Sequence, residues 1–197
     1  MERAILFTGI GGQGIQLAAQ ILARAAVAEG RHALLFGSYG GTMRGGPTDS
    51  TLLVADAPVT GTPIVSRAWA GLGMHPSFFP AVAAKLEPGA VVCVNASLFE
   101  DGLAEPQIEP PWRVFSVEAT RLASELGAGR AGSLLLLGAF ANATALVSLD
   151  ALVAAMDATL PARRREHREL NEAALRRGFE VTPHAVAPAW TSSERAA

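Results

Sequence analysis

The stretch that decides the fold is residues 4–36, AILFTGIGGQGIQLAAQILARAAVAEGRHALLF. It begins with a short apolar run at residues 4–8, which is typical of a strand buried on both faces of a sheet. Apolar residues then recur at spacings of three and four from Ile15 to Ala26, which predicts a helix, and Gly30 stands where helices commonly end. A second apolar run follows at once, at residues 33–36. This alternation predicts a βαβ unit with a right-handed crossover.

The remaining sequence continues the alternation and then becomes helical. Four further strands are predicted at residues 50–55, 63–67, 90–95 and 112–117. One helix is predicted among these strands and four after them, at residues 75–87, 118–126, 131–146, 149–160 and 162–177. We expect an α/β protein with three layers, α/β/α, a mostly parallel or mixed central sheet and a helical C-terminal part. Residues 1–180 would form one domain, followed by a loosely ordered C-terminal tail at 181–197.

Individual residues predict where some elements begin and end. Ser148 carries the hydroxyl that is common at a helix N-cap. Pro161 is suited to start the last helix and Gly178 to stop it. The pair Pro88-Gly89 predicts a turn before the strand that follows it.

The composition excludes several classes of protein. With 16 Lys and Arg against 18 Asp and Glu, the formal net charge is −2, so we expect neither nucleic acid nor a membrane as a partner. Lys85 is the only lysine, and no P-loop is present. Cys93 is the only cysteine, which excludes a disulfide framework, a zinc ribbon or an iron–sulfur cluster held by this chain alone. The apolar residues 131–147 are too short for a membrane span and residues 4–8 for a signal-peptide core, so we expect a cytoplasmic protein.

The first candidate site is the turn at residues 9–14, which contains Gly9, Gly11, Gly12, Gln13 and Gly14. Glycines permit positive φ and let backbone N–H groups approach an anion, and the helix behind them presents its positive N-terminal end. The turn therefore favours a phosphate or diphosphate ligand. The alternative is a tight strand-to-helix turn that binds nothing.

A dinucleotide site would also need an acidic residue at the end of the second strand, where it binds the ribose hydroxyls. That strand ends in Leu35-Phe36-Gly37-Ser38 without an acid, and no arginine follows it directly. The phosphate-binding half of the pattern is present and the ribose-binding half is absent. Binding of NAD or NADP is therefore the less favoured interpretation, and a free-standing Rossmann-like NAD(P)-dependent oxidoreductase is kept as the second hypothesis.

A second glycine-rich loop, YGGTMRGG at residues 39–46, carries Arg44, Gly45 and Gly46. In an α/β sheet the loops after the first two strands lie at the same carboxyl edge, where ligands bind. Arg44 is therefore a candidate ligand for the same anion as the first turn. The alternative is a flexible loop in which Arg44 pairs with a surface carboxylate.

No residues predict catalysis by this chain. It contains no GxSxG elbow, HExxH motif or Cys/His metal-ligand spacing, its four histidines are dispersed, and Cys93 lies in an apolar strand. The Gly-Asp-Gly signature of a thiamine diphosphate and Mg²⁺ site is also absent. We therefore expect no catalytic and no metal-binding residues. The last helix is rich in Arg and Glu, which favours a solvated face with ion pairs over a contact face for an acidic partner.

Four segments together resemble the gamma subunit, or gamma domain, of the 2-oxoacid:ferredoxin (acceptor) oxidoreductases. They are GIGGQGIQLAAQILARAA at 9–26, SYGGTMRGGPTDSTLLVADAPV at 38–59, GRAGSLLLLGAF at 129–140 and LNEAALRRGFE at 170–180. Gly-Gly-Gln-Gly followed some thirty residues later by Arg-Gly-Gly is far more specific than either motif alone. Many members carry Pro-Glu shortly before Arg-Gly-Gly where this chain has Gly41-Thr42, so the role of that Glu does not transfer.

The resemblance implies a reaction in which a 2-oxoacid and CoA give acyl-CoA, CO₂ and two electrons. It implies thiamine-binding alpha and beta subunits and a ferredoxin-like delta subunit as partners, with thiamine diphosphate, Mg²⁺ and 4Fe–4S clusters on these partners. This chain would bind no cofactor alone and would help to bind CoA at a subunit interface. Gly11, Gly12, Gln13 and Gly14 would hold the CoA phosphates, and Arg44 to Gly46 would border the same mouth.

In this interpretation the isolated chain is inactive. The acyl pocket would lie mainly in the thiamine-bearing subunits, so pyruvate, 2-oxoglutarate, branched-chain and aryl 2-oxoacids all fit the resemblance, and the electron acceptor is equally open. A scaffold whose glycine loops contact only protein is a third, non-enzymatic alternative.

Overall fold

The computed structural model of the chain describes residues 1–39, 45–60, 65–99, 112–160 and 167–190. Its strands are β1 (Glu2–Ile10), β2 (His32–Tyr39), β3 (Pro47–Ala55), β4 (Ala68–Gly73), β5 (Leu86–Asn95) and β6 (Arg113–Val117). Its helices are α1 (Ile15–Ala28), α2 (Phe79–Ala83), α3 (Ala119–Glu125), α4 (Gly132–Thr144), α5 (Leu149–Thr159) and α6 (Arg168–Glu180), with a 3-10 turn η1 (Pro76–Phe78) before α2. Within these ranges no helix is long and apolar enough to cross a lipid bilayer.

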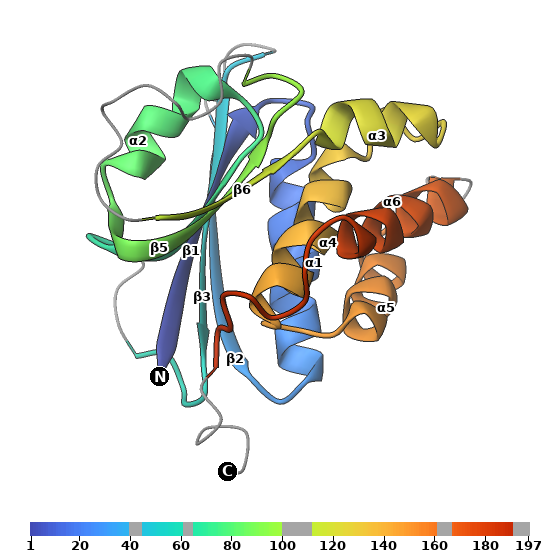
Figure 1. Cartoon of the computed structure of the whole chain (residues 1–197). Coiled ribbons are helices and arrows are strands. Elements are labelled where there is room, and N and C mark those ends of the chain that lie inside the picture. Colours follow the sequence, from blue (N-terminus) through green and yellow to red (C-terminus); the bar gives the residue numbers. More distant parts are fainter. Residues whose placement is uncertain (40–44, 61–64, 100–111, 161–166, 191–197) are drawn as a thin grey trace.

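The six strands form one mixed sheet in the order β2-β3-β1-β4-β5-β6. Strands β1, β4, β5 and β6 pair in parallel, whereas β3 is antiparallel to both of its neighbours, β1 and β2. Strands β1 and β2 therefore run in the same direction with β3 between them, and α1 connects one to the other (Figure 1). The predicted α/β fold with a mixed central sheet is confirmed.

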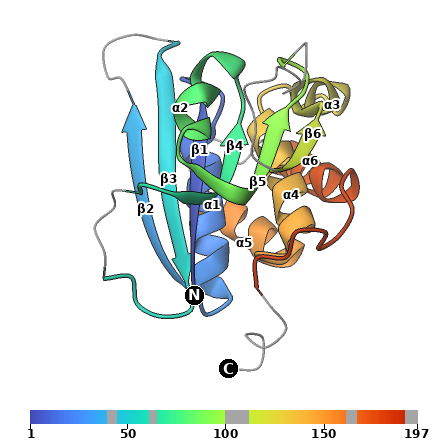
Figure 2. The same ribbon diagram turned by 60° about the vertical axis from the view of Figure 1, so that its left-hand side comes forward.

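Helices cover the two faces of the sheet unequally (Figure 1, Figure 2). On one face α1 and α4 pack on the strands, and α5 and α6 lie outside them. On the other face the short α2 packs on β1 and β4. Side chains alternate accordingly along β1, because Ile5 and Phe7 join the large core under α1 and α4 while Leu6 joins a smaller core with Phe79 and Val82 of α2. The expected three layers are present, and one of them is a single short helix.

The strand predicted at residues 63–67 is wrong in position, because residues 65–67 are not in a strand and β4 begins after them. Residues 61–64 lie outside the described part of the chain. The sequence of β4 is AWAGLG, and alanine and glycine are depleted in strands, so it shows no strand pattern. Packing against α2 explains the glycines. A Cβ at Gly71 would lie 2.9 Å from the side chain of Val82, and a Cβ at Gly73 would lie 2.6 Å from that of Phe79. The small residues of β4 therefore let α2 lie close to the sheet.

The helix predicted at residues 75–87 is shorter than expected, since α2 ends at Ala83 and β5 begins only three residues later. The pair Pro88-Gly89 lies inside β5 and does not precede it. The register between β4 and β5 shifts in this part of the strand. Gly89 has a φ of +82°, a conformation that glycine adopts without steric cost, so the predicted turn is an irregularity within the strand.

The prediction that Gly178 stops the last helix is wrong, because Gly178 lies inside α6 where this helix crosses α4. A Cβ at Gly178 would lie 1.9 Å from the carbonyl oxygen of Leu135, and a Cβ at Gly138 would lie 2.2 Å from that of Leu175. The two glycines therefore allow the backbones of α4 and α6 to touch. Pro161, predicted to start this helix, lies outside the described residues.

The other C-terminal helices agree with the sequence. Helices α3, α4 and α5 fall within the ranges predicted for them. Ser148 is the N-cap of α5, and its hydroxyl accepts a hydrogen bond of 3.2 Å from the amide of Ala151.

A loosely ordered tail is wrong for residues 181–190, here called the C-terminal segment, while residues 191–197 lie outside the described part. Three amides of this segment donate to carbonyls near the end of α4, from Ala185 to Asn142, from Ala187 to Ala143 and from Ala189 to Thr144. Trp190 is buried, and the Arg3 side chain of β1 donates a 2.7 Å hydrogen bond to the carbonyl of Ala189. The C-terminal segment is thus attached to both α4 and β1.

Replacing either glycine of the α4–α6 crossing by alanine is expected to destabilise the fold, because the new methyl group would overlap backbone atoms of the other helix. For Gly138→Ala and Gly178→Ala we expect a loss of about 3 kcal/mol each in the free energy of unfolding, measured by urea titration. Gly132→Ala, also in α4, is the matched control, because its Cβ would lie in ordinary contact at 3.4 Å from Met74. Equal stability of Gly138→Ala and Gly132→Ala would contradict the close crossing.

Candidate functional site

The glycine-rich turn between β1 and α1 is held in shape by Gln13. The amide of Gln13 donates to the carbonyl of Ile10 at 3.0 Å, and the Gln13 side-chain oxygen accepts from the amide of Ile10 at 2.8 Å. A Cβ at Gly9 would lie 2.6 Å from this Gln13 oxygen and 2.7 Å from the side chain of Ile15. Gly9 therefore makes room for the folded-back glutamine, whose oxygen is occupied within the turn.

The positive end of α1 is open toward this turn. Gly14 is the N-cap residue at a φ of +82°, so no side chain caps the helix, and the first turn contains no acidic residue. The first N–H groups of a helix have no acceptor within it and carry the positive end of the helix dipole. Gly11 and Gly12 are exposed beside them, and Gly12 has a φ of +102°. This arrangement presents several backbone N–H donors to an anion.

The second glycine-rich loop meets the first through its last two residues. The amide of Gly11 donates to the carbonyl of Gly46 at 2.9 Å, and Gly45 has a φ of +85°. The contact follows from the sheet, because Ile10 at the end of β1 pairs with Pro47 at the start of β3. The structure therefore brings Gly45 and Gly46 to the turn at residues 9–14, as predicted. Arg44 lies outside the described residues.

An acidic residue does lie beside the end of β2, although the second strand itself has none. Asp49 of β3 pairs with Thr8 of β1 and with Ser38 of β2, and its carboxylate accepts a 2.6 Å hydrogen bond from the Thr8 hydroxyl. Because Phe7 faces α1, the alternation along β1 turns Thr8 and its partner toward the opposite face of the sheet. Asp49 is therefore not placed to bind ribose hydroxyls beside α1.

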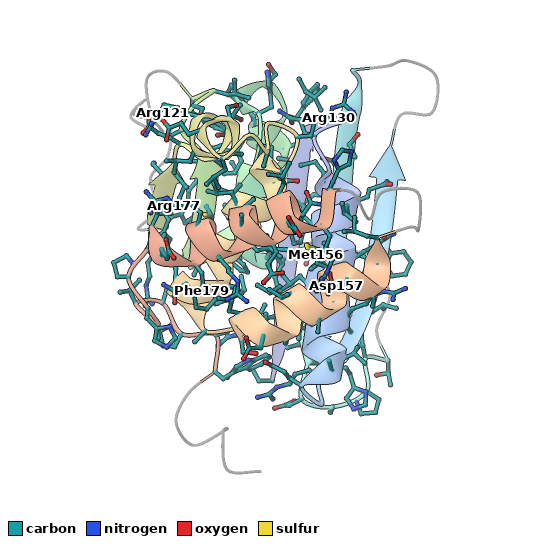
Figure 3. All side chains as sticks on the ribbon, turned by 90° about the vertical axis from the view of Figure 1, so that its right-hand side faces the viewer. Arg121, Arg130, Met156, Asp157, Arg177 and Phe179 are labelled. Atoms are coloured by element: carbon teal, nitrogen blue, oxygen red, sulfur yellow. The ribbon has the colours of Figure 1, made fainter. Side chains whose placement is uncertain are left out.

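Ser133 at the start of α4 lies next to the turn and is not among the predicted site residues. The Ser133 hydroxyl lies 2.6 Å from the position that a Cβ of Gly14 would take. Arg130 precedes α4 by two residues and lies exposed at the end of the molecule where α1 begins (Figure 3). The segment GRAGS at 129–133 belongs to the family resemblance, but only the fold places it beside residues 9–14.

Neither Cys93 nor a cluster of metal-ligating side chains supplies a reactive group in the described ranges. Cys93 is fully buried, and this burial raises the pKa of its thiol far above the usual range, which keeps it protonated and unreactive. No group of three or more His, Cys, Asp or Glu side chains suited to a metal ion is found in the described ranges. The ion pairs Arg168–Asp157, Arg176–Glu172 and Arg177–Glu180 fit the predicted solvated, ion-paired face of the last helix.

The fold and this turn define an α/β chain in which a glycine-rich strand–turn–helix lies at the carboxyl edge of a mixed sheet. Residues 4–181 match the model of the pyruvate ferredoxin/flavodoxin oxidoreductase family, and the chain belongs to this family.

Relatives of this chain are subunits of oxidoreductase complexes. The chain is 31% identical over 180 residues to the common gamma subunit of the pyruvate/ketoisovalerate oxidoreductases of Thermococcus litoralis, covering 90% of this chain and 96% of the relative. It is 29% identical over 184 residues to a 2-oxoglutarate synthase subunit, KorC, of Methanocaldococcus jannaschii, covering 92% and 94%. The resemblance to gamma subunits is thus confirmed.

Solved structures agree with this assignment. The gamma subunit of a keto/oxoacid ferredoxin oxidoreductase from Geobacter sulfurreducens superposes with a TM-score of 0.75 at 29% identity, over 91% of this chain and 95% of that one. The 2-oxoglutarate:ferredoxin oxidoreductase of Magnetococcus marinus shares the fold at a TM-score of 0.77 and 16% identity, over 94% of this chain and 34% of that chain. The same fold thus occurs alone and within a longer polypeptide.

The contact of Gln13 with Ile10 predicts a difference between two substitutions. Gln13→Leu removes the acceptor of the Ile10 amide and is expected to lower the free energy of unfolding by about 1–2 kcal/mol. Gln13→Glu keeps an oxygen at that place and is expected to retain the stability of the unmodified chain. Urea unfolding, combined with hydrogen exchange at the Ile10 amide, measures both effects, and equal exchange rates in the two variants would contradict this role of Gln13.

Proposed function

We propose that this chain is a non-catalytic subunit of a 2-oxoacid:acceptor oxidoreductase and that it contributes to CoA binding and to subunit assembly. The thiamine-binding alpha and beta subunits would bring thiamine diphosphate and Mg²⁺. A ferredoxin-like delta subunit would complete the complex, and the 4Fe–4S clusters would lie on partner subunits. The overall reaction would convert a 2-oxoacid and CoA to acyl-CoA, CO₂ and a reduced acceptor.

The observation that carries the proposal is the junction of the two glycine-rich loops at the open end of α1. The hydrogen bond from the Gly11 amide to the Gly46 carbonyl joins the loops, and the uncapped first turn of α1 begins beside them, next to the exposed Gly12. Helix N-termini with such glycine turns bind phosphate groups, and CoA carries a diphosphate and a 3′-phosphate. Arg44, which precedes Gly45, would add a positive charge beside the same turn.

The residues of this chain do not fit the cofactors of the reaction, which supports their place on other subunits. Cys93 is the only cysteine of the sequence and is buried, whereas a 4Fe–4S cluster needs several thiolates. No Gly-Asp-Gly sequence is present to hold Mg²⁺ and thiamine diphosphate. The chain would therefore act by holding and orienting a substrate for partners that carry out the bond changes.

The Magnetococcus marinus enzyme was solved with 2-oxoglutarate, CoA and succinyl-CoA bound. At 16% identity its likeness to this chain extends to the fold alone. The proposal for CoA therefore rests on the turn at residues 9–14 and on the loop contact described above.

Gly12→Asp in the assembled complex tests the CoA site. The position is exposed, and a Cβ added there would have no other atom within 4 Å, so the new carboxylate would stand in open space and repel an anion at the turn. We expect the KM for CoA to rise by about tenfold or more, which corresponds to about 1.4 kcal/mol or more of lost binding. The KM for the 2-oxoacid should change little.

Gly30→Asp is the matched control for this experiment. Gly30 also has positive φ, at +82°, is also exposed and has no neighbour within 4 Å, but it lies at the other end of α1. An unchanged KM for CoA in Gly12→Asp, or a rise of the same size in Gly30→Asp, would rule out the assigned site. Turnover of substrate by the isolated chain would rule out the non-catalytic role.

A free-standing NAD(P)-dependent enzyme makes a different prediction for the isolated chain. Millimolar NAD(H) or NADP(H) would raise its melting temperature if either nucleotide bound the folded state. We expect no shift, because the acidic side chain near the end of β2, Asp49, faces away from α1. A clear rise in melting temperature would favour the dehydrogenase hypothesis.

A further inference from the structure

Strand β2 is an outer strand of the sheet that lacks the usual protection of an edge. Within the described residues it pairs with β3 only, so the backbone groups on its outer side have no strand partner (Figure 2). Its eight residues, HALLFGSY, contain no Lys, Arg, Asp, Glu or Pro and pair with β3 without a shift in register. Edge strands of monomeric proteins are normally short, charged, bulged or interrupted by proline, because an open edge recruits another strand. β2 shows none of these features.

The other edge strand, β6, differs from β2 in length and in charge. It has only five residues and begins with the exposed Arg113. A short strand with a charged end is a common protection against pairing. The two edges are therefore not equivalent, and β2 is the one suited to bind a further strand.

β2 also carries apolar side chains that the helices do not cover. Ala33 and Leu35 pack against the main core under α1. The alternation of side chains turns Leu34 and Phe36 toward the opposite face, where α2 packs on β1 and β4 and not on β2. Phe36 is 40% exposed. A strand added beside β2 would cover part of this apolar surface.

One side of α1 lies along the same free edge. Four residues at spacings of four, three and four share this side of the helix: Gln16, Gln20, Ala23 and Val27. The first of them places it over β2, because a Cβ at Gly37 would lie 3.0 Å from the side-chain nitrogen of Gln16. Gln20 is exposed, and Val27 is 55% exposed. The open edge therefore has a strand layer and a helix layer.

This surface, made of β2 and the four α1 residues, contains no Lys, Arg, Asp or Glu. Two arginines that flank it are turned to partners in their own chain. Arg24 donates to the carbonyl of Ala158 at 3.4 Å, and the Arg31 guanidinium lies 4.1 Å from the centre of the Trp190 ring. In a two-fold interface the residues near the axis meet their own copies, so charges there would repel one another. The absence of charge thus suits a second copy of this chain.

The sequence of β2 is self-complementary about Leu35. When two antiparallel copies of β2 pair with Leu35 opposite Leu35, Ala33 lies opposite Gly37 and Leu34 lies opposite Phe36. Small residues then meet on the helix side, and apolar residues meet on the open face. Moving the centre by one residue in either direction separates Leu34 from Phe36 and sets Leu35 opposite Gly37 or Ala33.

We infer that β2 and the exposed side of α1 form a two-fold interface between two copies of this chain. The two sheets join through β2, and the two α1 helices lie side by side on the same face. Gln16 lies at the level of Gly37, and Leu35 lies about 7 Å from Gly37 toward the start of β2. Because α1 runs in that direction at about 1.5 Å per residue, Gln20 lies close to the level of the axis. Its side-chain amide therefore meets the same amide of the second copy.

The size of the surface suits a dimer. β2 is about 26 Å long and the strand and helix layers together are about 20 Å high, so the surface spans roughly 500 Å² on each copy. The two copies together reach about the 1,000 Å² that a specific interface needs. This inference does not rest on the proposed function, because the surface contains no residue of the turn at 9–14.

The oligomeric state of the full chain in solution tests the interface. We expect sedimentation velocity to show a dimer whose population rises with concentration. Phe36→Lys places a charge in the middle of the edge and is expected to raise the dissociation constant of the dimer by about thirtyfold or more. Val114→Lys is the matched control, because Val114 is 42% exposed on the other edge strand, and it should leave this constant unchanged.

Gln20 supplies a test that depends on the two-fold axis. Gln20→Glu and Gln20→Lys each set two like charges beside one another, and each is expected to raise the dissociation constant by about tenfold. A mixture of the two variants should form a mixed dimer more tightly than either variant alone, because opposite charges then meet. A mixture that associates no better than its components would overturn the inference.

Three further outcomes would overturn it. One is a chain that stays monomeric at its highest soluble concentration, and another is equal weakening by Phe36→Lys and Val114→Lys. The third is a chain that is monomeric alone but whose β2 amides become protected from hydrogen exchange in the assembled complex, which would assign the edge to another subunit. Circular dichroism shows whether each variant folds. If Phe36→Lys does not, the mixture of Gln20 variants decides, since Gln20 lies exposed on a helix.

Discussion

The antiparallel pairing of β3 with β1 is the constraint on which the site depends. It places the first residue of β3 opposite the last residue of β1, and it makes β1 and β2 parallel across the strand between them. Both glycine-rich loops therefore emerge at one edge of the sheet, where the amide of Gly11 reaches the carbonyl of Gly46. A purely parallel order, with β2 beside β1, would not require these loops to touch. The position of β3 thus decides which loop lies against the first turn.

The sequence predicts the parts of this structure that are encoded locally. The first strand and helix, the mixed α/β class and the N-cap at Ser148 follow from short patterns that neighbouring residues complete. Strand β4 lies outside its predicted range because its Gly71 and Gly73 serve the packing of α2, which a local pattern does not contain. The prediction for Gly178 is wrong for the same reason, since a glycine at a helix crossing and a glycine at a helix end look alike in sequence.

The candidate site divides in the same way. The turn at residues 9–14 and the glycines at 45–46 are predictable, because strand–glycine–helix spacing is a local signal. Ser133 is not, since it lies more than a hundred residues beyond the first turn and only the fold brings the start of α4 beside Gly14. Gln13 is a predicted ligand-binding residue, and its side-chain oxygen also accepts a hydrogen bond from the amide of Ile10, a contact that sequence spacing does not indicate. Sequence spacing does not show which side chains already form hydrogen bonds within their own loop.

The attachment of the C-terminal segment to β1 has a bearing on how this fold can be joined to others. Arg3 near the start of β1 donates to Ala189, so the two ends of the described chain are neighbours, on the amino side of the sheet. The glycine turn lies at the opposite, carboxyl side. Polypeptide added at either end would leave from the side of the sheet opposite the glycine turn. A fold with this geometry suits gene fusion, and within the longer Magnetococcus marinus chain it occupies only part of the polypeptide.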